Sequence, residues 1–147
     1  MQELYGIDFH TIAYYEKPWL KQLRQVYSGQ GIEYDKLTTR QILQKQLRPF
    51  LMGDAKIHSY SHHLSHAAAG FQTSPYTHAT VVVIDAIGEF DTISIWHAEY
   101  DKYGKAQYKK LWGRSYPNSI GLFYSAMTKR VGLRPLDEEY ILMGMAA

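Results

Sequence analysis

Three histidines lie close together in the stretch "SHHLSHAAAGF" (residues 61–71), and their spacing suits metal binding. His62 and His66 are four residues apart, so on a helix their imidazoles share one face, with Cβ atoms about 6 Å apart. Two imidazoles in this arrangement can both reach one divalent ion at about 2.1 Å. The alternative is a histidine-rich helix start that binds no metal, and the spacing alone favours this reading because two ligands do not make a tight site.

A carboxylate and a glycine follow in "TVVVIDAIGEF" (80–90). Asp85 comes at the end of an apolar strand, where the chain turns toward Gly88, and Glu89 adds a second acid. A carboxylate there can bind a metal-bridged phosphate or orient a substrate, and the N–H groups of a turn can hold an anion. The alternative is an ordinary hairpin turn in which aspartate is a turn residue.

A third segment, "SIGLFYSAMTKRVG" (119–132), predicts a helix with Asn118 or Ser119 as its N-cap. Gly121 in the first turn lowers helix propensity by about 1 kcal/mol relative to alanine. Its presence indicates either close packing or a ligand at the helix N-terminus. Packing of the apolar residues into a core explains most of the segment.

Two elements are expected before the histidines. A strand within 8–18 leads into a helix over 19–28, and Pro18 suits the first position of this helix. A second amphipathic helix is expected over 36–53, capped by Thr38 or Thr39.

The elements around the chemistry-bearing residues alternate between strand and helix, which predicts an α/β fold. A short strand over 55–61 feeds the histidine helix. A β-hairpin is expected over 78–99, with its connection centred on Gly88 and its first strand apolar enough to be covered on both faces. A third strand of the same sheet is expected over 105–115, and a last helix with acids in its first turn over 137–147.

The composition excludes several classes of protein. The 147 residues are 46% hydrophobic and 20% charged, which is typical of one globular domain. The 16 basic residues are interleaved with 14 acidic ones, so no nucleic-acid partner is expected. The absence of cysteine excludes disulfides and thiolate metal sites and fits a cytoplasmic protein. No signal peptide or membrane-spanning run is recognised.

Three segments, taken in order, resemble the NodU/CmcH/TobZ family of O-carbamoyltransferases: "HHLSHAAAGF", "VVVIDAIGEFDTISI" and "SIGLFYSAMTKRVGLRPLDEEYILMGMAA". The earlier "IAYYEKPWLKQL" is similar to a strand-to-helix segment of the same family. The resemblance implies a Kae1-like catalytic domain with the actin–Hsp70–sugar kinase fold. It also implies an enzyme that uses carbamoyl phosphate and ATP to form carbamoyl-adenylate, then transfers the carbamoyl group to a hydroxyl of a small metabolite.

The resemblance also implies site residues. His62 and His66 would bind a divalent metal, Fe²⁺ or else Zn²⁺, together with an aspartate from the C-terminal half of the domain. His63 and Asp85 would be catalytic, with a neutral histidine taking the proton of the acceptor hydroxyl. The expected nucleotide and carbamoyl pocket comprises Asp85, Gly88, Glu89, Ser119 and Gly121.

Two positions depart from the family pattern. Ala86 stands where glycine is usual, and its methyl group requires an ordinary φ. Ile141 stands where many members have lysine. These departures keep open an alternative reading, a non-catalytic remnant or interaction module of the same fold. A protein of the tRNA threonylcarbamoyl-modification type is a second alternative.

We interpret residues 1–147 as one incomplete Kae1-like domain. Residues 1–54 would form a strand–helix–helix segment, and residues 55–147 the metal-motif helix, the hairpin and the following helices. The sequence ends on the apolar run "ILMGMAA", which indicates a piece of a longer protein. We therefore expect this chain alone to be inactive. A homo-oligomer is compatible with the sequence.

Overall fold

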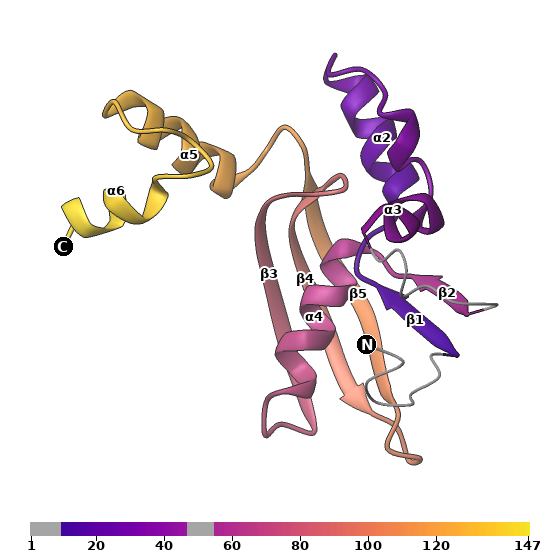
Figure 1. Cartoon of the computed structure of the whole chain (residues 1–147). Helices are drawn as coiled ribbons and strands as arrows, with labels where there is room; N and C mark the ends of the chain where they lie inside the picture. The colour runs from indigo at the N-terminus through magenta and orange to yellow at the C-terminus, as the bar shows by residue number, and fades with distance from the viewer. Residues whose placement is uncertain (1–9, 47–54) are drawn as a thin grey trace, which may run out of the picture.

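A computed structural model of the chain describes residues 10–46 and 55–147 (Figure 1). Over these residues the fold is mixed α/β, as predicted, with helices flanking two small sheets. One sheet pairs two strands in parallel, and the other pairs three antiparallel strands in chain order. The strands within the described residues are β1 (Thr11–Tyr14), β2 (Lys56–Ser59), β3 (His78–Gly88), β4 (Asp91–Tyr100) and β5 (Ala106–Ser115).

The helices near the N-terminus begin as the sequence predicts. Helix α2 (Pro18–Tyr27) has its proline at the first position, where the missing N–H costs nothing. A short 3₁₀ turn, η1 (Tyr34–Lys36), precedes α3 (Thr39–Gln46). Thr38 is the cap of α3: its hydroxyl accepts a hydrogen bond from Gln41 N, while the Gln41 side chain accepts one from Thr38 N. The part of the predicted helix beyond Gln46 lies outside the described residues.

The hairpin and the third strand form as predicted, with Val83 opposite Ser94 and Ile95 opposite Trp112. The predicted centre of the connection is wrong. Gly88 still belongs to β3 and pairs with Asp91, so the turn consists of residues 89–90. The sequence pattern favoured a glycine turn, but this glycine is needed in the strand because two histidine rings pack against it.

Helix α4 (His62–Gln72) lies across one face of the three-stranded sheet (Figure 1). The buried core between them centres on Ala67, Val83 and Trp96. On the opposite face, Val82 and Ile84 are 55% and 57% exposed. The prediction that this strand is covered on both faces is therefore wrong for the described part of the chain, in which α4 covers one face only.

The chain ends with α5 (Ile120–Arg130) and α6 (Glu139–Met145), which extend away from the sheet on the side opposite α2 and α3 (Figure 1). Ser119 caps α5, and Glu139 places an acid in the first turn of α6, both as predicted. Among the described helices, none has the length and apolar character that crossing a membrane requires.

Candidate functional site

The side chains of His62, His66 and Asp85 converge where the start of α4 meets the end of β3. His62 Nε2 lies 2.9 Å from Asp85 Oδ2 and 3.0 Å from His66 Nε2. One ligand atom from each of the three residues lies within 4.8 Å of the other two. The two imidazole rings, one helical turn apart, have centroids 4.6 Å apart. The structure thus brings together the histidine pair and the aspartate that the sequence singled out separately.

A local irregularity in the hairpin gives Asp85 its place. The regular pairing of β3 with β4 is interrupted between Ile84 and Gly88, so the intervening residues bulge out of the ladder. Bulges commonly re-aim a side chain next to a functional site. Here the bulge begins at Asp85, whose Oδ1 accepts a hydrogen bond from Ala86 N at 2.6 Å.

Gly88 lets the histidine helix approach the hairpin. A Cβ atom built on Gly88 would lie 2.5 Å from His62 Cδ2 and 2.7 Å from His63 Cδ2. Both distances are too short for non-bonded carbon atoms, so only glycine leaves room for the rings. Gly88, which the sequence predicted as a pocket residue, therefore has a direct role in placing His62 and His63.

Asp85 and His62 form a close acid–imidazole pair. The bond to His62 lowers the pKa of the Asp85 carboxyl, and the Ala86 N–H adds to this effect. The same bond raises the pKa of the His62 imidazole, although burial opposes the rise. His62 Nδ1 is buried and makes no hydrogen bond to any described residue. The Tyr15 ring packs edge-on against His62, with centroids 5.5 Å apart.

The donor set fits a divalent metal. Two imidazole nitrogens and a carboxylate oxygen are ligands that suit zinc or iron. In a tetrahedral site, two ligand atoms that are each about 2.1 Å from an ion lie about 3.4 Å apart. His62 Nε2 lies 2.9 Å from Asp85 Oδ2 and 3.0 Å from His66 Nε2, so small side-chain shifts suffice to hold an ion. The sequence predicted Asp85 as a catalytic residue and a residue of the nucleotide and carbamoyl pocket, and it predicted an aspartate from the C-terminal half as the third metal ligand. It did not indicate this arrangement, because the bulge that creates it has no clear sequence signal.

His63 lies apart from these three residues. It is 1% exposed, and its Nδ1 is 2.6 Å from Ser94 Oγ, which also accepts a hydrogen bond from Trp96 Nε1 at 2.7 Å. Burial lowers the pKa of His63 and so favours the neutral imidazole. Its Nε2 is buried and has no hydrogen-bond partner among the described residues.

Glu89 connects the hairpin turn to the first helix. Its carboxylate accepts a hydrogen bond from Lys17 N, at the start of α2, and the side chain is buried. Burial raises the pKa of this carboxyl above its ordinary value. Its backbone adopts φ = 60°, a left-handed conformation. This acid therefore holds two distant segments together instead of joining the cluster of ligand atoms.

Ser119 and Gly121 hold the start of α5 against the bulge. Ser119 Oγ accepts a hydrogen bond from Leu122 N at 3.0 Å and donates one to Ala86 O at 2.7 Å. A Cβ atom on Gly121 would lie 2.7 Å from Ala86 Cα. Ala86 itself has no positive φ, so its backbone conformation suits alanine as well as glycine.

Comparison with known families matches residues 13–147 to the family described as "Carbamoyltransferase N-terminus". The chain is 32% identical, over 92% of its length, to the "Uncharacterized protein sll1178" of Synechocystis sp.. It is 30% identical, over 78% of its length, to the "Uncharacterized protein MJ1058" of Methanocaldococcus jannaschii. The aligned regions make up 24% and 20% of these two relatives, so the chain spans about a quarter or less of their length.

Proposed function

The chain belongs to the carbamoyltransferase family, and from this premise we propose that it forms part of the catalytic domain of an O-carbamoyltransferase. The proposed reaction moves a carbamoyl group from carbamoyl-adenylate, made from carbamoyl phosphate and ATP, to a hydroxyl of a small metabolite. The mixed α/β architecture is compatible with the Kae1-like fold that we assign to this domain. Because the chain spans so little of its relatives, we expect it to be inactive alone.

The single observation that carries this proposal is the convergence of His62, His66 and Asp85. These three residues would hold a divalent ion, Fe²⁺ or Zn²⁺. Such an ion, when bound, supplies Lewis-acid stabilisation of negative charge on a carbonyl or phosphoryl oxygen. The His62–Asp85 contact orients one imidazole, and Gly88 provides the space that both neighbouring rings need.

The proton of the acceptor hydroxyl needs a base, and we propose His63. Its burial favours the neutral form that a base requires. This role requires the tautomer in which Nδ1–H donates to Ser94 Oγ and Nε2 keeps a free lone pair. Ser94 Oγ would then accept from both His63 and Trp96, which its two lone pairs allow.

The residues behind the cluster would shape the nucleotide and carbamoyl pocket. Ser119 and Gly121 bring the N-terminus of α5 against the backbone of Asp85 and Ala86. The N-terminus of a helix favours negative charge, as on a phosphate or carbamoyl oxygen. Glu89 contributes by fixing the hairpin turn to Lys17 N.

Metal titration of the full chain tests the proposal. We expect one Fe²⁺ (under anaerobic conditions) or Zn²⁺ per chain by isothermal titration calorimetry. His66→Ala should weaken this binding by at least about tenfold, because it removes one ligand and leaves the buried residues intact. His97→Ala is the matched control, since His97 lies on β4 and is not among the three converging residues. Absence of binding in the chain and in its full-length parent would favour the non-catalytic remnant.

A second assay tests the activity. The full-length parent should carbamoylate a hydroxyl acceptor when given carbamoyl phosphate and ATP, and His62→Ala should abolish this transfer. Carbamoyl transfer by the 147-residue chain alone would contradict the expectation that the chain is incomplete.

A further inference from the structure

The imidazole of His62 lacks the hydrogen bond that normally orients a histidine bound to a metal. Such a histidine usually donates the N–H of its other ring nitrogen to a carboxylate, a carbonyl or a water, and this bond fixes the ring. His62 Nδ1 is buried and has no hydrogen-bond partner among the described residues. Asp85 contacts Nε2 instead, the same nitrogen that lies beside His66 Nε2. An ion bound to Nε2 would replace this hydrogen bond, so packing must then hold the ring.

Two segments pack against the His62 ring. Tyr15, the residue after β1, lies edge-on to it, with ring centroids 5.5 Å apart and ring planes at 62°. Gly88 brings the backbone of β3 against the same imidazole, since a Cβ atom there would lie 2.5 Å from His62 Cδ2. The backbone of a paired strand cannot turn aside. The Tyr15 side chain can restrain His62 only if it is itself held in place.

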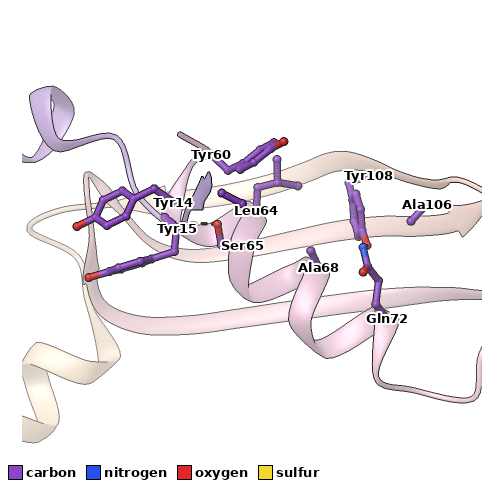
Figure 2. A pocket seen from close by; sticks show the side chains of 10 residues that line it. Tyr14, Tyr15, Tyr60, Leu64, Ser65, Ala68, Gln72, Ala106 and Tyr108 are labelled. Atoms are coloured by element: carbon purple, nitrogen blue, oxygen red, sulfur yellow. Dashed lines mark hydrogen bonds between the residues drawn. The ribbon is translucent and has the colours of Figure 1, made fainter. Parts of the chain in front are cut away.

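Tyr15 is tied to the helix that carries His62. Its carbonyl oxygen accepts a hydrogen bond from the Ser65 hydroxyl at 3.1 Å, drawn as a dashed line in Figure 2. On a helix with about 100° per residue, Ser65 lies about 60° around α4 from His62. The Tyr14 ring packs against the Tyr15 ring, with centroids 4.9 Å apart. These contacts set the position of the Tyr15 ring relative to α4.

The Tyr15 ring meets solvent as well as His62. It lines an open groove of about 520 Å³ beside α4 (Figure 2), and the lining of this groove includes neither His62 nor His66. The Tyr15 side chain is 52% exposed, so a smaller residue at this position would leave no buried cavity. The effect of a substitution should therefore be local to the His62 ring.

We propose that Tyr15 is a positioning residue of the candidate metal site, whose ring holds the His62 imidazole with Nε2 toward His66 and Asp85. This inference rests on the proposed function, because it concerns the same ion. The contact joins the two rings and does not involve the tyrosine hydroxyl. Phenylalanine should therefore replace Tyr15 without loss, whereas alanine should not.

Isothermal titration calorimetry of the full chain with Zn²⁺ tests the inference. Tyr15→Ala should weaken binding by about tenfold, the lower end of the effect of removing a group that orients a metal ligand. Tyr15→Phe keeps the ring and should bind within about twofold of the unmodified chain. Tyr60→Ala is the matched control and should also leave the affinity unchanged. Tyr60 lines the same groove and is 47% exposed, but no ring contact joins it to His62 within the described part of the chain.

NMR spectra of the metal-free chain, recorded with a chelator, give a second readout that needs no ion. An aromatic ring shifts the signals of the protons beside it. The His62 ring protons, assigned by their loss in His62→Gln, should therefore move in Tyr15→Ala and stay in place in Tyr15→Phe and Tyr60→Ala. Far-ultraviolet circular dichroism should be the same for all the variants, which shows that the chain remains folded.

The outcomes separate this inference from the proposed function. If Tyr15→Ala binds Zn²⁺ as tightly as the unmodified chain, or leaves the His62 signals in place, the inference is overturned and the proposed function stands. An equal loss of affinity in Tyr15→Phe or Tyr60→Ala would also overturn it, because the ring contact would not be the cause. If neither the chain nor its full-length parent binds Zn²⁺ or Fe²⁺, the proposed function fails, and the inference fails with it.

Discussion

Asp85 Oδ2 lies 2.9 Å from His62 Nε2, although the two residues come from the end of a strand and the start of a helix. The contact ties the bulge of β3 to the first turn of α4. It raises the pKa of His62 and lowers that of Asp85, as expected for an ion pair. A proton and a metal therefore compete for the same nitrogen, because a metal ligand must be deprotonated.

Asp85→Asn should destabilise the metal-free chain more at low pH than at high pH. The folded state raises the pKa of His62, so the stability that this imidazolium contributes is complete below the ordinary histidine pKa, about 6.5. It is lost as the pH rises through the raised value. We expect a loss of about 1–2 kcal/mol near about pH 5.5 and less near about pH 8.5. Denaturant unfolding at the two pH values, in the presence of a chelator, measures both losses of stability.

Glu99→Gln is the matched control for this experiment. His97 and Glu99 form a second histidine–acid pair, 3.4 Å apart, but both side chains are exposed. Exposed pairs contribute little, so this variant should change stability by less than about 0.5 kcal/mol at either pH. An equal, pH-independent loss in Asp85→Asn would mean that the carboxylate acts through packing and not through the charge on His62.

Gly88→Ala should displace the histidines. The new Cβ atom would overlap His62 Cδ2 at 2.5 Å and His63 Cδ2 at 2.7 Å, so one or both rings must move. We expect divalent metal binding to weaken by about tenfold or more, because ligand positions must be held closely for a tight site. Gly70→Ala, on the helix α4 that carries the histidines, is the control: its Cβ meets only Val81, at an ordinary 3.9 Å. Unchanged metal affinity in Gly88→Ala would show that metal binding does not depend on the positions of the His62 and His63 rings.

Local patterns predicted most of the elements that surround the site. Each of these elements is specified by residues that are near one another in the sequence. The histidines four residues apart lie on a helix, the apolar run before Asp85 is a strand, and Ser119 caps α5, all as expected. The turn was misplaced because glycine is the usual turn residue, whereas Gly88 is required by a packing contact with His62.

The contacts that the sequence did not predict join residues that are distant along the chain. Glu89 bonds to the backbone of Lys17, which is 72 positions away, and no sequence spacing indicates that pairing. The bulge that aims Asp85 at His62 is likewise set by how β3 and β4 pair with each other. The apolar run that includes Val82 and Ile84 predicted burial on both faces of the strand, yet both side chains are more than half exposed. The prediction failed because hydrophobicity alone does not show which segment covers a given face.

Gly121→Ala should destabilise the chain in spite of a better helix propensity. Alanine gains about 1 kcal/mol in a helix interior, but the added methyl would lie 2.7 Å from Ala86 Cα, and backbone atoms do not yield easily. We expect a net loss of about 1–3 kcal/mol in the free energy of unfolding, measured with denaturant. Gly144→Ala in α6 meets nothing within 4 Å, so it should be neutral or stabilising. If both variants gain stability, α5 does not pack against the bulge as described.

Glu89→Gln should stabilise the chain at neutral pH. Burial raises the pKa of Glu89 in the folded state, so its contribution to stability is largest below the ordinary glutamate pKa, about 4.3, and is lost as the pH rises through the raised value. Glutamine keeps an oxygen that accepts the Lys17 N–H and removes the cost of a buried charge. We therefore expect a gain near about pH 7 that disappears below about pH 4, measured by denaturant unfolding. Glu89→Ala, which leaves Lys17 N without its partner, should lose about 1–2 kcal/mol at both pH values. A glutamine variant that is less stable at neutral pH would mean that the ionised carboxylate itself holds the hairpin turn to α2.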